Sequence, residues 1–220
     1  MKKIKVLTVA LCSSLLWCGS IAAGAFEQGA LSAKPVSYRL SYVQVLDPTH
    51  HMGEVKINAF LRSLTEDYYG QAQKTIKAVE GELVGPARWE FLIKNTETSI
   101  DDQYRTIEVT TYQYTGGAHG TSHLTAYLFD RNTGIPVDIG AYTYYESLDK
   151  ERLIAQLEAT AAKRQLPLFP DGIRELLLKP GYVPTLTIRQ GMPMIVFNQY
   201  EVAPYSSGII VLPLLPIKDQ

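Results

Sequence analysis

The residues with the most chemical potential lie in "QYTGGAHGTSHLTAYLFD", residues 113–130. Its histidines, His119 and His123, are four positions apart, the spacing at which one face of a helix holds two zinc ligands. The surrounding sequence favours strands, and on a strand four residues span about 13 Å. Because two ligands of one zinc ion each lie only about 2 Å from the metal, this pair does not indicate a metal site. We expect no metal and no other cofactor.

Nucleophilic catalysis is a second chemistry that the residue types allow. Ser206 lies in "APYSSG", and His119 or Glu201 could assist it in an arrangement of serine, histidine and acid. The chain lacks the G-x-S-x-G pattern that presents a catalytic serine on a sharp turn. A hydrolase that uses His119 with Ser206 or Glu201 is therefore an alternative to a non-catalytic role.

Glycines accompany these side chains in both stretches. Gly116, Gly117 and Gly120 surround His119, and Gly208 follows the serine pair. Glycine adopts backbone conformations that other residues disfavour, so we assign these four a structural role. A phosphate loop is not indicated, because the glycines lead into a strand and no lysine is near.

Tyrosine points to recognition instead of catalysis. The chain has 14 tyrosines, and several lie in or beside the same loops. Tyrosine combines a large contact area with a polar tip, which favours it at binding surfaces. The candidate binding residues are Tyr114, His119, Tyr200, Glu201 and Tyr205. Packing in a core or sheet is the alternative role for many of the tyrosines.

Alternating strands and two amphipathic helices must position these loops. Residues 36–46 alternate with period two, which predicts a strand, whereas the apolar residues from Glu54 to Val79 recur every three or four positions, which predicts a long helix. A second helix is predicted over 145–164, and Asp171 is a candidate cap for a short helix over 173–178. The remaining predicted strands are 88–98, 104–115, 121–130, an extended 135–142, and three more after residue 182.

The order of these elements predicts an α+β fold, because strands and helices come in runs without strict alternation. We expect a mainly antiparallel sheet with two longer helices packed on it. Residues 26–220 would form one module, in which 36–100 and 101–216 are candidate subdomains.

The first 25 residues have the layout of a secretory signal peptide. Three lysines precede an apolar run, and Ala23-Gly24-Ala25 predicts cleavage after Ala25. Both cysteines, Cys12 and Cys18, lie in this leader, so no disulfide is expected in the exported protein. Lipid attachment at Cys18 is disfavoured because the bulky Trp17 precedes it. We expect export to the periplasm or the medium, with no membrane span retained.

The net charge indicates which classes of binding partner are disfavoured. Without the three leader lysines, 18 basic and 22 acidic residues remain, a net charge of −4. This balance does not favour nucleic acid or an anionic membrane as partner.

Two segments resemble the signature stretches of a family of exported bacterial domains of unknown function. They are "YQYTGGAHG", residues 112–120, and "VFNQYEVAPYSSG", residues 196–208. The family includes the extracytoplasmic part of the lysozyme-sensing anti-sigma-V factor and the N-terminal region of a Bacillus peptidoglycan deacetylase. The resemblance implies an α+β module at the cell envelope, with no sigma-binding segment and no deacetylase domain in this sequence. We expect a non-catalytic module that binds a lysozyme-like protein or a peptidoglycan fragment. A purely structural envelope domain is a further alternative.

Overall fold

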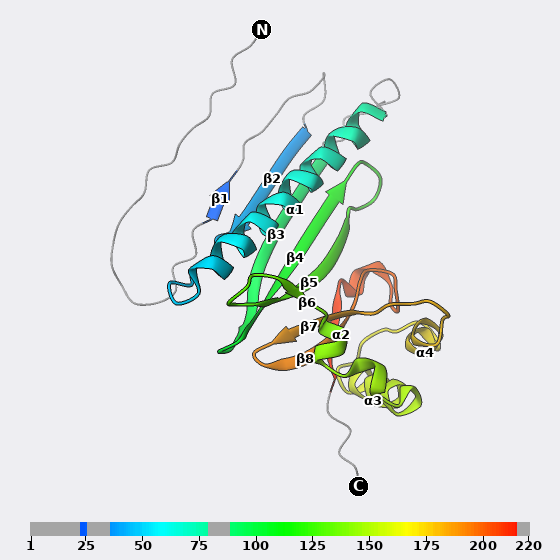
Figure 1. Ribbon diagram of the computed structural model, residues 1–220. Helices are drawn as coiled ribbons and strands as arrows, with labels where there is room; N and C mark the ends of the chain where they lie inside the picture. Colours follow the sequence, from blue (N-terminus) through cyan, green and yellow to red (C-terminus); the bar gives the residue numbers. More distant parts are fainter. Residues whose placement is uncertain (1–22, 26–35, 79–88, 215–220) are drawn as a thin grey trace.

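The computed structural model of the protein describes residues 23–25, 36–78 and 89–214. These residues form a six-stranded sheet, a three-stranded sheet and several helices (Figure 1). The predicted α+β class, with a mainly antiparallel sheet, is confirmed.

The six-stranded sheet follows the chain from one edge to the other, in the order β1 to β6. Neighbouring strands are antiparallel except β2 and β3, which are parallel. The long helix α1, His51–Ala78, lies in the connection between these two strands, as a parallel pair requires. The strands are β1 Ala23–Ala25, β2 Val36–Val43, β3 Trp89–Ile100, β4 Tyr104–Tyr114, β5 Thr121–Asp130 and β6 Pro136–Val137.

One face of this sheet packs against α1. The alternation along β3 places Trp89, Phe91 and Ile93 in the core, opposite the buried Ile57 and Leu61 of the helix. The apolar stripe of α1 and the alternating residues of the strands therefore bury one another, and this burial is the main stabilisation of both elements.

The start of α1 rests on the turn between β5 and β6. Gly53 is buried, and a Cβ atom on it would lie 1.7 Å from the carbonyl oxygen of Arg131. Only glycine allows the helix and the turn to come this close. Gly134 has the positive φ of 67° that the predicted turn "RNTG" needs.

Just before this helix, the carboxylate of Asp47 contacts several polar and charged side chains. Its buried carboxylate accepts hydrogen bonds from Nε of Arg131 at 2.7 Å and from Oγ1 of Thr49 at 2.8 Å, and Nδ1 of His50 lies at 3.0 Å. Burial raises the pKa of Asp47, but the hydrogen bonds and the charge of Arg131 outweigh it, so the pKa lies well below its usual range. The carboxylate therefore stays ionised in the folded protein at neutral pH.

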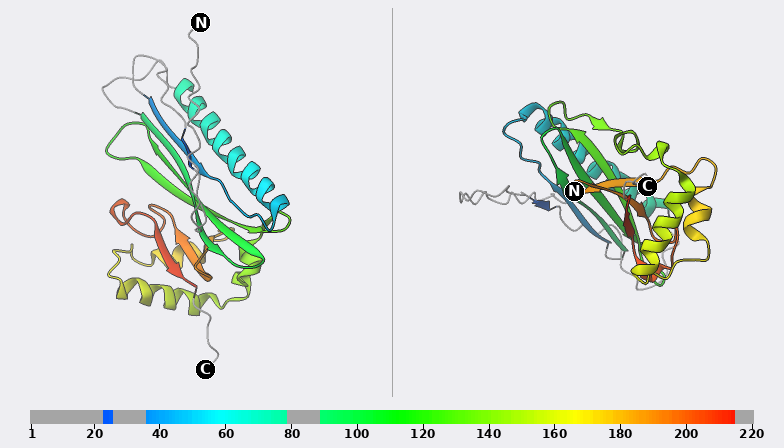
Figure 2. Two further views of the ribbon diagram at one scale, coloured as in Figure 1. Left: turned by 90° about the vertical axis from the view of Figure 1, so that its left-hand side faces the viewer. Right: turned by 90° about the horizontal axis from the view of Figure 1, so that it is seen from below.

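The opposite face of the large sheet carries the C-terminal layer (Figure 2). Its core includes Leu128 of β5, while the next residue, Phe129, belongs to the core under α1. The two hydrophobic cores therefore meet on β5. The layer consists of α2 Ile139–Tyr142, η1 Tyr145–Ser147, α3 Lys150–Lys163, α4 Gly172–Leu177, β7 Thr185–Arg189, β8 Met192–Phe197, η2 Tyr205–Ser207 and β9 Ile210–Pro213.

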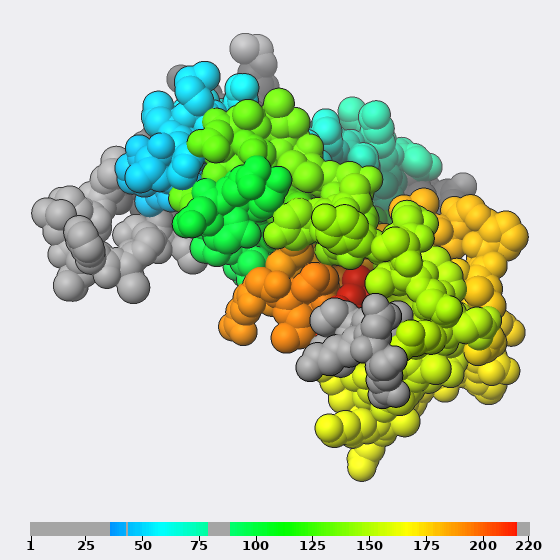
Figure 3. Space-filling model, turned by 60° about the horizontal axis from the view of Figure 1, so that its bottom comes forward, coloured from blue at the N-terminus to red at the C-terminus, as the bar shows by residue number. Residues whose placement is uncertain are grey.

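An ion pair between the buried Glu108 and the partly exposed Arg189 joins this layer to β4. The carboxylate of Glu108 accepts two hydrogen bonds from the guanidinium of Arg189, at 2.7 and 2.8 Å, and a third from Thr187 at 2.9 Å. The tip of the β7–β8 hairpin also bonds the end of β3, because the N–H of Gln190 donates to the carbonyl oxygen of Thr98. Figure 3 shows this hairpin, in orange, lying against the green β3–β4 end.

Three sequence predictions for this layer were wrong in detail. The extended segment 135–142 contains only the short β6, because the Asp138 side chain accepts hydrogen bonds from Gly140 and Ala141 and starts α2. The helix expected from Tyr145 begins at Lys150, where Asp149 is the cap. Asp171 precedes α4 but makes no side-chain cap, since its backbone has a positive φ of 52°.

The predicted leader lies largely outside the described residues, apart from β1. Cleavage after Ala25 would remove β1 and leave β2 at the edge of the sheet. Among the described residues, none of the helices is long and apolar enough to cross a membrane.

Gly53 and Gly70 offer a matched test of how α1 is seated. Gly53→Ala should lower the free energy of unfolding by about 2 kcal/mol or more, because its methyl group would overlap the turn. Gly70→Ala should raise it by about 0.5–1 kcal/mol, since a Cβ atom there meets nothing and alanine favours the helix. Denaturant unfolding measures both. Equal effects of the two changes would contradict this packing.

Candidate functional site

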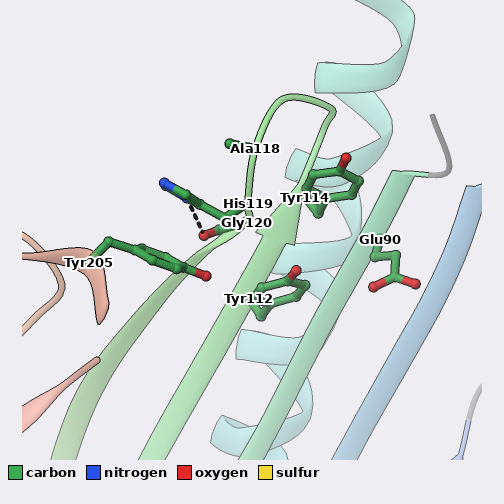
Figure 4. A pocket seen from close by; sticks show the side chains of 7 residues that line it. All are labelled: Glu90, Tyr112, Tyr114, Ala118, His119, Gly120 and Tyr205. Carbon is green, nitrogen blue, oxygen red and sulfur yellow. Dashed lines mark hydrogen bonds between the residues drawn. The ribbon is translucent and has the colours of Figure 1, made fainter. Parts of the chain in front are cut away.

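The C-terminal layer covers only part of its face of the sheet. It packs near Glu108 and Leu128, whereas the end of β4 that leads into the β4–β5 loop stays partly exposed. Strand register places Glu90 of β3 opposite Tyr114 of β4, and Tyr112 is two residues back on the same face. Figure 4 shows these three side chains rising from this face.

Glycines shape the β4–β5 loop around these tyrosines. Gly116 and Gly117 have φ values of 106° and 95°, and the carbonyl oxygen of Gly117 accepts a hydrogen bond from the Tyr114 hydroxyl at 3.0 Å. Gly120 has a different role, because a Cβ atom there would lie 2.4 Å from the ring of Tyr112. The absent side chain of Gly120 therefore leaves the space in which the Tyr112 ring lies.

Two side-chain amides attach the second signature segment to β5, just after the first segment. The buried Asn198 accepts a hydrogen bond from the N–H of Leu124 at 2.7 Å and donates one to its carbonyl oxygen at 3.3 Å. Gln199 accepts from the N–H of Ser122 at 2.6 Å. These residues of β5 lie beyond the short pairing with β6 at Leu128 and Phe129. We call these contacts the amide bridge, because side chains here satisfy the backbone edge that a neighbouring strand would otherwise satisfy.

A tight turn follows the amide bridge and presents Tyr200. The N–H of Glu201 donates to the carbonyl oxygen of Asn198 at 3.1 Å, and the Glu201 carboxylate accepts from the N–H of Asn198 at 2.6 Å. Between them Tyr200 has a φ of 67°, a left-handed conformation that costs a non-glycine residue about 1 kcal/mol or more. The turn thus holds a strained residue whose side chain is 51% exposed.

The two segments meet in an aromatic cluster. The rings of His119 and Tyr205 stack with centroids 3.6 Å apart and planes 14° apart. Nε2 of His119 lies 3.0 Å from the hydroxyl oxygen of Tyr200, and Nδ1 lies 3.3 Å from the carbonyl oxygen of Gly120. A carbonyl oxygen only accepts, so Nδ1–H of His119 is the donor in the contact with Gly120.

An open hollow of about 340 Å³ lies beside this cluster. It is lined by Glu90, Tyr112, Tyr114, Ala118, His119, Gly120 and Tyr205. Burial raises the pKa of Tyr112, and the charges of Glu90, Tyr205 and Tyr114 raise it further. We call the set His119, Tyr200, Tyr205, Tyr112 and Tyr114 the aromatic surface.

The proposed catalytic partners do not converge on His119. Its hydrogen bonds go to Tyr200 and Gly120, while the Glu201 carboxylate bonds the backbone of its own turn. Ser206 is exposed on η2. Among the described residues, neither Ser206 nor Glu201 is within hydrogen-bond distance of the imidazole. His123 is exposed on the α1 side of β5, away from His119.

Comparison with known proteins identifies the fold. No family model and no curated protein matches the chain. The crystal structure of a DUF3298 family member from Bacteroides fragilis NCTC 9343 is similar, with a TM-score of 0.53 and 14% identity, covering 89% of this chain and 90% of that chain. A DUF3298 family protein from Pseudomonas aeruginosa PAO1 gives a TM-score of 0.57 and 15% identity, covering 90% of both chains. The chain has the DUF3298 fold. At these identities the likeness concerns the fold alone.

Within the DUF3298 fold, sequence reasoning overlooked the residues that assemble the surface. Asn198 and Gln199 were not selected, although two amides directly after the apolar β8 are a signal for side chains that bond backbone. Glu90 was also missed, because only the strand register places it beside Tyr114.

Asn198→Ala tests the amide bridge. The change should lower the free energy of unfolding by about 1–3 kcal/mol, because the buried N–H and carbonyl oxygen of Leu124 lose their partner. Gln199→Ala is the matched control and should cost less than about 1 kcal/mol, since water can reach Ser122 at the sheet edge. Chemical denaturation measures the cost, and amide hydrogen exchange at Leu124 locates it. Unchanged exchange at Leu124 would show that the bridge is not formed.

Proposed function

We propose that the protein is a non-catalytic binding module of the cell envelope, whose aromatic surface binds a lysozyme-like protein or a peptidoglycan fragment. The observation that carries the proposal is the stacking of His119 on Tyr205, which joins two segments more than eighty residues apart into one accessible surface. Buried tyrosines would serve packing alone, but here Tyr200 is half exposed and strained.

The geometry favours binding over hydrolysis. A catalytic serine needs a base within about 3 Å, but His119 bonds Tyr200 and Gly120, and the Glu201 carboxylate bonds its own turn. The hollow is open and not an enclosed cleft that would exclude water from a reaction. Both features suit contact with a large ligand.

The ligand class and the compartment come from the sequence. The two segments resemble domains of the envelope, one of which senses lysozyme. A net charge of −4 after removal of the leader would favour a basic protein such as lysozyme.

Affinity capture tests the proposal. Immobilised protein should retain lysozyme or soluble peptidoglycan fragments at about 0.05 M salt and release a basic protein at about 0.5 M, because salt screens surface charges. Tyr205→Ala should weaken retention by about tenfold or more, as expected for a central aromatic contact.

His123→Ala is the control, because this histidine is exposed but lies on the other face of the sheet. It should retain the ligand as the unmodified protein does. Capture of neither ligand at low salt, or equal capture by both variants, would contradict the proposal.

Export is tested separately. We expect the protein recovered outside the cytoplasm to begin at Phe26, since the small residues before it suit signal peptidase. N-terminal sequencing reads this residue directly. A chain that retains Met1 and stays in the cytoplasm would contradict export.

A further inference from the structure

Glu90 is a carboxylate in an unusual place on the aromatic surface. It is half-buried, and it borders the hollow together with Tyr112, Tyr114 and Tyr205. Within the described part of the chain it forms no ion pair and no side-chain hydrogen bond. A partly desolvated charge without a counter-ion is costly, and it gains when a cation binds.

The neighbouring tyrosines suit the same cation. The face of a tyrosine ring carries negative electrostatic potential and attracts an ammonium or guanidinium group within about 6 Å of its centre. Glu90 lies at one side of the hollow beside Tyr112 and Tyr114, and Tyr205 lies on the far side of Tyr112 (Figure 4), so the hollow combines charge attraction with cation–π attraction. The protein already uses this contact elsewhere, because Nζ of Lys150 lies 3.5 Å from the ring centroid of Tyr145.

The described cationic side chains on this face of the sheet do not pair with Glu90. Arg39 of β2 and Lys94 of β3 project from the same face as Glu90 by strand register. Both are exposed, and neither forms an ion pair with Glu90. Among the described residues Glu90 therefore has no counter-ion, and a cation of another molecule can bind it.

We propose that the hollow receives a lysine or arginine side chain of the partner protein, held by Glu90 and by the rings of Tyr112 and Tyr114, with Tyr205 lining the far side of the hollow. This inference rests on the proposed function and narrows its ligand to a basic protein. A hollow open to solvent suits a side chain that projects from a protein surface, whereas a neutral glycan offers no positive group to Glu90.

A matched pair of small probes tests the charge requirement. N-acetyl-arginine methylamide and its neutral counterpart, N-acetyl-citrulline methylamide, have nearly the same shape. In NMR titrations of the protein with ¹³C-labelled tyrosine, the arginine probe should shift the ring signals of Tyr112, Tyr114 and Tyr205. Its affinity should exceed that of the citrulline probe by at least about fivefold.

Two variants that each remove one negative charge complete the test. Glu90→Gln should lower the preference for arginine to the part that the tyrosine rings alone supply. Asp67→Asn, at an exposed position on α1 across the sheet, should keep it. Equal binding of the two probes to the unmodified protein, no binding of either, or an undiminished preference in Glu90→Gln would each overturn the inference.

The outcomes separate this inference from the proposed function. If lysozyme or a peptidoglycan fragment is captured through Tyr205 while the two probes bind equally, the proposed binding function is supported and the cation site is contradicted. If arginine is preferred through Glu90 but neither macromolecule is captured, the cation site stands and the proposed ligands fall.

Discussion

The candidate site depends on the amide bridge between Asn198, Gln199 and the free edge of β5. A strand edge needs partners for its N–H and carbonyl groups, and β6 supplies them only at Leu128 and Phe129. The two amides satisfy the edge at Ser122 and Leu124. By bonding this edge, Asn198 and Gln199 fix the start of the turn that carries Tyr200, and the turn places Tyr200 beside His119.

The site also depends on the fact that the C-terminal layer covers only part of one face of the large sheet. Near Glu108 the C-terminal layer is held by the ion pair between Glu108 and Arg189 and by its own hydrophobic core. Toward the β4–β5 loop this cover ends, and Glu90, Tyr112 and Tyr114 line a hollow. The sheet is thus a rigid support, on which local turns and glycines place exposed aromatic side chains. Such placement on rigid elements is what a recognition surface requires.

The helices and strands and several of the site residues could be predicted from the sequence. The contacts that bring the site residues together could not. Periodicity predicted α1 closely, because the helix buries one face and so repeats its apolar pattern. The strand-like runs 104–115 and 121–130 likewise match β4 and β5. The start of α3 was misplaced, since the apolar residues before Asp149 continue the helical pattern although η1 interrupts it. His119, Tyr200 and Tyr205 were selected by residue type. Glu90 and Asn198 depend on strand register and long-range hydrogen bonds, for which a single sequence carries only weak signals.

The central claim is that two distant segments form one aromatic surface in the folded protein. Nuclear Overhauser contacts between the rings of His119 and Tyr205 in solution measure this directly, because the stacked rings lie 3.6 Å apart. We predict strong contacts between the two rings and a ring-current shift of the His119 protons that Tyr205→Leu removes. Absence of these contacts, with His119 signals at the positions of an unfolded peptide, would contradict the account.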